Sequence, residues 1–142
     1  METCAAIANI GKGHKGYVLV GIAENAKTAS RVQEIFGSQP LSFGGFYVTG
    51  VDHEAKHVGK NLDQMFQDIT DRVGRSALSE PLKSYINSHL KCVQYYDKTV
   101  FVFEILGQDG PSHLNGKWPE RQGAQVKDVP PDRMGSLFDR FK

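Results

Sequence analysis

The sequence predicts an α/β (α+β) protein in which a mixed central β-sheet is packed with about four helices. Apolar residues recur at helical spacing in several segments, most clearly over 61–73. Short apolar runs of strand length, such as 17–22 and 99–106, lie between glycine-rich or polar stretches. Because 142 residues fit one domain, we expect a single domain over residues 1–142.

Glycines delimit the elements expected in the first half of the chain. Residues 3–10 have the composition of a buried helix that stops at Gly11, and 26–36 that of a helix that ends at Gly37. The other elements expected here are a strand over 17–22, a loop over 40–45, a strand over 46–51 and a polar surface loop over 52–60.

The second half begins with the most regular helical pattern. Five apolar residues at positions i, i+3, i+4, i+7 and i+11 form one face of a helix over 61–73: Leu62, Met65, Phe66, Ile69 and Val73. The elements expected after it are a hairpin of strands 89–96 and 99–106 across Asp97 and Lys98, a loop over 107–119, a strand over 124–129 and a closing helix over 131–141.

The bulk composition excludes several classes of protein. A formal net charge of +1 does not by itself indicate a nucleic-acid partner, so any basic footprint must be local. Cys4 and Cys92 lack metal-ligand spacing, which predicts reduced, buried thiols in a cytoplasmic protein. No apolar run approaches the ~18 residues that span a bilayer, and the N-terminus lacks a secretory signal. We therefore expect no membrane partner.

The glycine-rich stretch "ANIGKGHKGYVLVGI" at residues 8–22 invites comparison with a phosphate-binding P-loop. A P-loop follows a strand and opens a helix, whereas here a helix precedes the glycines and a strand follows them. No Ser or Thr follows a Gly-Lys pair, which excludes the P-loop. Lys12, His14 and Lys15 still place three basic groups on one turn, either as contacts to a phosphate backbone or as a solvated turn.

The segment His53-Glu54-Ala55-Lys56-His57 matches the HExxH pattern of zinc peptidases. That pattern binds zinc when both imidazoles lie one turn apart on a helix and a third ligand completes the site. Here the segment lacks apolar periodicity, and no third ligand is evident in the sequence. We therefore expect a polar surface loop, with no metal site and no cofactor.

Two further features are candidates for function. Lys117, Trp118 and Arg121 combine the only tryptophan with two cations, a composition that stacks a base and holds a phosphate, although Trp118 could equally anchor its loop on the core. Glu24 follows the predicted strand over 17–22, and strand ends in α/β sheets commonly line sites. Glu24 is thus the acid best placed for catalysis.

Together, three segments resemble the Schlafen-type nucleic-acid-binding domain, also called the divergent AAA or AlbA-type domain. The first, "CAAIANIGKGHKGYVLVGIAEN", has an alanine-rich helix ending in Ala-Asn, a glycine-rich turn and an apolar strand. The second, "PSHLNGKWPERQGAQVKDVPPDRMGSLF", is similar to the family's Pro-x-x-x-x-Gly-x-aromatic-x-x-Arg-x-Gly segment and closing helix. "KTVFVFEILG" lies between them, at the place of the family's central strand, and a longer turn replaces the family's Gly-Gly pair.

The resemblance implies a module of regulatory or defence proteins that binds DNA or RNA. Some members cut transfer RNA with three carboxylates, and the position of Glu24 matches the third of these. The other two lie in a strand upstream of the alanine-rich helix, and this sequence begins after that position. A metal-assisted nuclease needs several carboxylates to hold its cation. We therefore expect an N-terminally truncated domain with an incomplete catalytic set.

These observations favour a cytoplasmic nucleic-acid-binding module, of the kind used in transcription regulation, with six predicted site residues: Lys12, His14, Lys15, Lys117, Trp118 and Arg121. The lysines and Arg121 are expected to contact backbone phosphates, and Trp118 is expected to stack a base. One alternative is a Mg- or Mn-dependent endoribonuclease that uses Glu24 with acids such as Asp52 or Glu54. Another is a protein-interaction domain, such as a homodimer in which a second copy covers apolar surface of the first helix.

Overall fold

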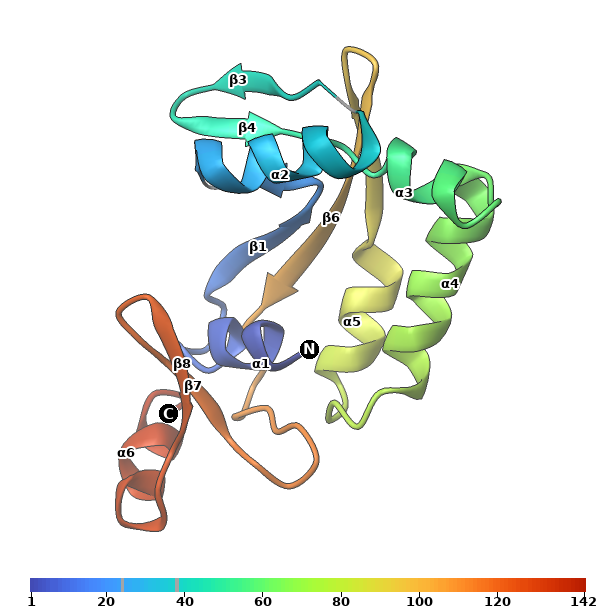
Figure 1. Ribbon diagram of the computed structural model, residues 1–142. Helices are drawn as coiled ribbons and strands as arrows, with labels where there is room; N and C mark the ends of the chain where they lie inside the picture. Colours follow the sequence, from blue (N-terminus) through green and yellow to red (C-terminus); the bar gives the residue numbers. More distant parts are fainter. Residues whose placement is uncertain (24, 38) are drawn as a thin grey trace. The chain divides into compact units, whose positions relative to one another are not determined.

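The computed structural model describes residues 1–23, 25–37 and 39–142, and it confirms the α+β class. Six α-helices and three small antiparallel sheets lie within these residues (Figure 1). The strand orders of the sheets are β1-β6-β5, β2-β4-β3 and β7-β8. No helix in the described part of the chain has the length and apolar character needed to cross a bilayer.

The chain forms two compact units. Unit 1 comprises Met1–Val18, Thr70–Leu90 and Phe103–Lys142, and unit 2 comprises Leu19–Ile69 and Lys91–Val102. Three elements contribute residues to both units: β1 (Lys15–Val20), α4 (Leu62–Arg75) and β6 (Lys98–Leu106).

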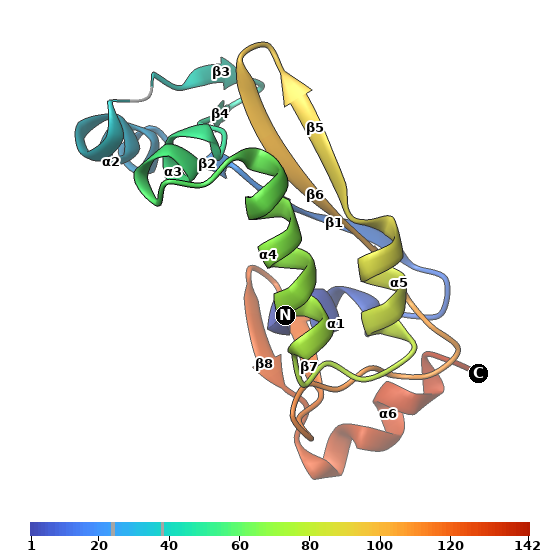
Figure 2. The ribbon, with the colours of Figure 1, turned by 90° about the vertical axis from the view of Figure 1, so that its right-hand side faces the viewer.

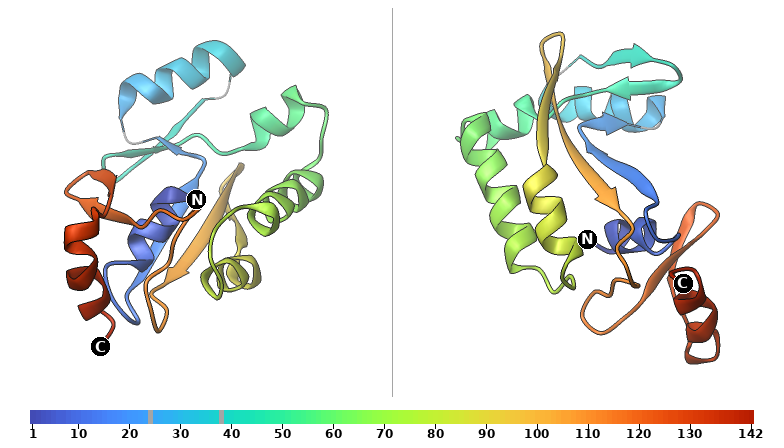
Figure 3. Two further views of the ribbon diagram at one scale, coloured as in Figure 1. Left: turned by 90° about the horizontal axis from the view of Figure 1, so that it is seen from below. Right: turned by 180° about the vertical axis from the view of Figure 1, so that it is seen from behind.

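Unit 1 contains α1 (Glu2–Ala8), whose residues from Cys4 to Ala8 are all buried. Helix α5 (Leu82–His89) runs beside the end of α4 (Figure 2) and buries Leu82 and Ile86. Strands β7 (Pro119–Gln122) and β8 (Gln125–Asp128) form a hairpin that packs along α1 (Figure 3). A 3-10 turn (Pro131–Arg133) leads into α6 (Met134–Asp139).

The C-terminal part of unit 1 has a small apolar core of its own. Val129, Leu137 and Phe141 are buried there, and Trp118 and Met134 pack against them. Because Trp118 immediately precedes β7, this core ties the hairpin to α6. Trp118 therefore anchors its segment on the core, which is one of the two roles considered for it from the sequence.

Unit 2 contains α2 (Ala26–Phe36), α3 (Asp52–His57) and two antiparallel strand sets. One set is formed by β2 (Ile22–Ala23), β3 (Leu41–Phe43) and β4 (Phe46–Val48). The other pairs β5 (Lys91–Tyr95) with β6, from Lys91 opposite Val102 to Tyr95 opposite Lys98. Phe66 of α4 meets the buried Phe101 of β6 at a ring-centroid distance of 5.7 Å.

Several sequence expectations were wrong in detail. The loop expected over 40–45 contains β3 and a two-residue turn at Gly44 and Gly45, whose positive φ angles of 53° and 86° suit a tight hairpin. The loop expected over 52–60 contains α3, and no element was predicted for α5. The hairpin turn lies at Tyr96 and Asp97 rather than at Asp97 and Lys98.

The cysteine expectation was half correct. Cys4 is buried in α1, and this burial raises the pKa of its thiol. Cys92, in contrast, is exposed on β5, which is an edge strand of its sheet. Both cysteines are free thiols, as the sequence predicts.

Helix α2 offers a local test of the fold in unit 2. Asn25 caps this helix, because its side-chain oxygen accepts a hydrogen bond from the Thr28 amide at 2.9 Å. We expect Asn25→Ala to lower the free energy of unfolding by about 1 kcal/mol, measured by urea denaturation. Asn25→Asp, which keeps the acceptor, should retain most of the stability; an equal loss in both variants would contradict the capping role.

Candidate nucleic-acid interface

The side chain of Asn9 joins the two basic segments that the sequence analysis singled out. It is fully buried directly after α1. Its amide donates to the carbonyl oxygens of Ser112 at 2.9 Å and Pro119 at 2.8 Å, and its Oδ1 accepts from the Ser112 amide at 2.7 Å. The turn that carries Lys12 and the strand end next to Trp118 therefore share one buried anchor in unit 1.

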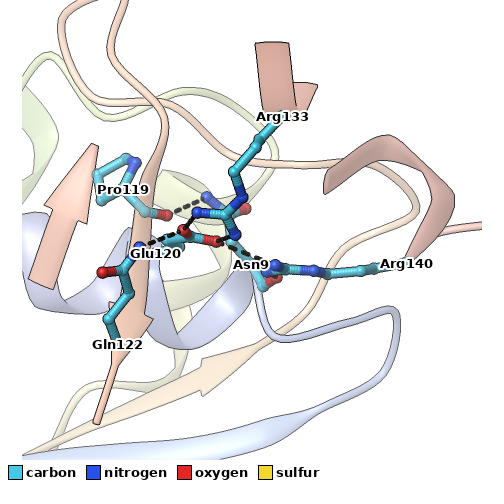
Figure 4. Close-up of polar contacts among 6 residues, drawn as sticks. All are labelled: Asn9, Pro119, Glu120, Gln122, Arg133 and Arg140. Carbon is cyan, nitrogen blue, oxygen red and sulfur yellow. Dashed lines mark hydrogen bonds and ion pairs between the residues drawn. The ribbon is translucent and has the colours of Figure 1, made fainter. Parts of the chain in front are cut away.

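A buried carboxylate fixes the closing helix beside this anchor (Figure 4). Glu120 is 2% exposed, and its oxygens meet Arg133 Nη1 at 2.6 Å and Arg140 Nη2 at 2.9 Å. Gln122 donates to the same carboxylate at 2.9 Å. Arg140 also donates to the carbonyl oxygen of Asn9 at 3.1 Å, so the two anchors form one network.

The charge state of Glu120 follows from these contacts. Burial alone would raise its pKa, but hydrogen bonds from Gln122, Arg140 and Arg133, with the charge of Arg133, outweigh burial and lower the pKa. The carboxylate is therefore ionised at neutral pH and neutralises part of the two arginine charges. Arg133 and Arg140 thus act as structural cations.

In the turn after α1, the groups available to bind an anion are side chains rather than the backbone amides of Gly13 and His14. The Gly13 amide donates to the Gly107 carbonyl at 2.9 Å, and the His14 amide donates to Gly11 at 3.2 Å. These two amides are therefore not available to form an anion-binding nest. The segments around Gly11 and Gly107 approach each other so closely that a Cβ on Gly107 would collide with the Gly11 carbonyl oxygen. Position 107 therefore requires glycine.

Both lysines of this turn lie near carboxylates. Lys12 Nζ is 3.5 Å from Asp109, and Lys15 Nζ is 3.9 Å from Glu104. Glu104 also accepts a hydrogen bond from the Tyr85 hydroxyl at 2.6 Å, the main reason that the pKa of Tyr85 is raised to about 12. The Lys12–Asp109 pair is exposed on both sides, and such surface pairs contribute about 0–1 kcal/mol, so a phosphate can compete for Lys12.

Trp118 borders a hollow on the surface of unit 1. Its ring is held by His113 at 5.0 Å and by Phe138 at 5.6 Å between ring centroids. The hollow has a volume of about 330 Å³ and is lined by seven residues: Gly116, Lys117, Trp118, Asp128, Val129, Pro131 and Met134. Lys117 Nζ lies 4.0 Å from the Asp128 carboxylate. The structure thus brings Lys117 and Trp118 to one concave site.

Arg121 lies apart from this hollow. Residues alternate between the two faces of a strand, so Arg121 of β7 points away from the face on which Glu120 meets Arg133 and Arg140. Its guanidinium is exposed and donates to the Gly123 carbonyl oxygen at 3.4 Å. Arg121 is therefore close to Trp118 in the sequence but does not line the same hollow. This separation was not expected, because β7 was not recognised as a strand.

The carboxylates proposed for nuclease activity do not form a cluster in the described part of the chain. Glu24 lies outside the described residues. Both oxygens of Asp52 accept hydrogen bonds from Thr99, one from its amide and one from its hydroxyl, each at 2.8 Å. Among the described residues, no group of three or more His, Cys, Asp or Glu side chains is placed to hold a metal ion.

The HExxH segment is helical rather than a loop, yet its histidines pack on an aromatic ring. The His53 and His57 rings lie 4.7 Å and 5.5 Å from the ring of Phe36. Glu54 is exposed, 3.8 Å from His53 Nε2. The helix therefore supplies two adjacent imidazoles that contact Phe36.

No protein-family model, curated protein or solved structure matched this chain. A function is therefore inferred from the geometry and chemistry of its own residues. The residues that organise the candidate interface, Asn9, Glu120, Arg133 and Arg140, were not among the predicted site residues. The only sequence signal for Asn9 is an amide directly after an alanine-rich buried helix, and Glu120 has the appearance of an ordinary surface charge.

Proposed function

We propose that the chain is a nucleic-acid-binding module that contacts mainly the phosphate backbone of DNA or RNA. All six residues predicted from the sequence lie in unit 1. Hydrogen bonds of the buried Asn9 join the segment that carries Lys12 to the segment that carries Trp118. This shared anchor is the observation that carries the proposal. The resemblance to the Schlafen-type domain points in the same direction.

The distribution of charge supports this assignment. Unit 1 contains eleven Lys and Arg against nine Asp and Glu, whereas unit 2 contains six against seven. Lys12, Lys15 and Lys117 are 52–72% exposed, and their carboxylate partners lie at 3.5–4.0 Å. A polyanion that binds these exposed lysines releases its own counterions, which favours association at low salt.

Salt dependence tests the proposal directly. We expect Lys12→Gln/Lys15→Gln to weaken binding of a fluorescently labelled oligonucleotide, and to reduce the slope of log K against log salt by about 1.4–1.8. The measurement is fluorescence anisotropy at several salt concentrations.

A matched control comes from unit 2. Lys27→Gln/Lys56→Gln removes two exposed helical lysines and the same total charge. This control should leave the salt slope close to that of the unaltered protein. Equal slopes for both double variants would rule out the Lys12–Lys15 turn as a contact, and no binding at low salt would rule out the module.

A further inference from the structure

We infer that the hollow beside Trp118 holds one unstacked base of a single strand, and that it favours a base with an exocyclic amino group. This inference rests on the proposed function and adds a ligand class to it. The hollow of about 330 Å³ is at the small end of the range for ligand pockets, which fits one base rather than a duplex groove.

The aromatic wall of the hollow is rigid. Trp118 is half-buried, and it is fixed by His113, Phe138 and the apolar core around Leu137. A fixed ring loses little conformational entropy when a flat partner stacks on it. Stacking of a base on an aromatic side chain is worth about 1–3 kcal/mol, and it requires that the base has left its own helix. The wall therefore selects single strands over duplexes.

The polar groups of the hollow determine which base fits best. Asp128 presents a carboxylate, which accepts hydrogen bonds and donates none when ionised. Cytosine offers an N4 amino donor to such a carboxylate, whereas thymine has a carbonyl oxygen at the same position. Lys117 is 72% exposed at the edge of the hollow, so its ammonium group is available to the neighbouring phosphate of a bound strand.

The intrinsic fluorescence of Trp118 reports on this site without a label, because the chain has a single tryptophan. We expect a short oligodeoxycytidine to quench this fluorescence and to bind about tenfold more tightly than an oligodeoxythymidine of equal length. We also expect it to bind more tightly than its own duplex with oligodeoxyguanosine. Both pyrimidine strands stack weakly, so a difference in stacking does not account for a tenfold preference.

Two variants identify the residues responsible. Trp118→Leu should abolish the preference for single strands, measured with labelled strands. Since Trp118 also packs on the core, Asp128→Asn serves as a surface variant that leaves the core intact. Asp128→Asn should reduce the tenfold preference for cytosine to less than about twofold without lowering the affinity for oligodeoxythymidine.

The outcomes separate this inference from the proposed function. Equal, salt-dependent binding of all three nucleic acids with unchanged Trp118 fluorescence would overturn the base-binding hollow and leave the module standing. If cytidine monophosphate alone bound as tightly as the strand, the ligand would be a free nucleotide and the single-strand assignment would be wrong. If none of the nucleic acids bound at low salt, both proposals would fall.

Discussion

Replacing Glu120 with glutamine is expected to lower the free energy of unfolding by about 3 kcal/mol, because Arg133 and Arg140 would lose their shared carboxylate. Removing one partner of a buried ion pair costs about 3–5 kcal/mol, and the lower end applies because both arginine side chains are 32–42% exposed to water. Urea denaturation followed by circular dichroism measures the change.

The effect of Glu120→Gln should depend on pH. The pKa of Glu120 is lowered in the folded protein from its ordinary value of 4.5, so the folded state favours the ionised form. Its contribution to stability is therefore fully present above about pH 4.5, and is lost as pH falls through the lowered pKa of the folded state. The difference between the two proteins should shrink in acid.

An exposed acid on the neighbouring 3-10 turn provides the control. Asp132→Asn removes the same charge from a side chain without buried partners among the described residues. We expect a change of less than about 0.5 kcal/mol with little pH dependence. A pH-independent difference for Glu120→Gln, or an equal loss for Asp132→Asn, would show that the ion pairs do not hold α6.

The sequence predicted those helices and strands whose characteristic residues lie within the element itself. The helix over 26–36 was correct in its bounds, because apolar spacing and the cap at Gly37 both lie within the segment. The pairing of β5 with β6 was correct, but the turn was misplaced and β5 begins at Lys91 rather than at His89, which ends α5. Strand β3 was missed because it has three residues, and such a short strand is stabilised by pairing with β4 rather than by its own pattern.

The candidate site shows the same division. The exposed cations could be listed from the sequence, because charge and turn residues predict exposure. The anchors could not, since Asn9 lies 103 residues from Ser112 and 110 from Pro119 along the chain. Periodicity carries no information about such contacts. No strand was predicted over 119–122, so the strand alternation that turns Glu120 inward and Arg121 outward was not considered.

The largest loss of stability is expected for Asn9→Leu, at about 4 kcal/mol. Leucine is larger than asparagine and offers no hydrogen bonds, so the Ser112 amide and the carbonyl oxygens of Ser112 and Pro119 lose their partner. Each buried polar group left unsatisfied costs about 1–3 kcal/mol. The loss should be accompanied by faster hydrogen exchange at the Ser112 amide, which Asn9 protects in the native state.

Asn87 provides a matched asparagine. It lies in α5, and its buried side-chain oxygen has no hydrogen-bond partner among the described residues. Asn87→Leu therefore removes an unsatisfied atom, and we expect a change of less than about 1 kcal/mol. If Asn9→Leu proved no more destabilising than Asn87→Leu, Asn9 would not be the anchor of the two basic segments. The proposed interface would then lose the contact that joins the segment carrying Lys12 to the strand end next to Trp118.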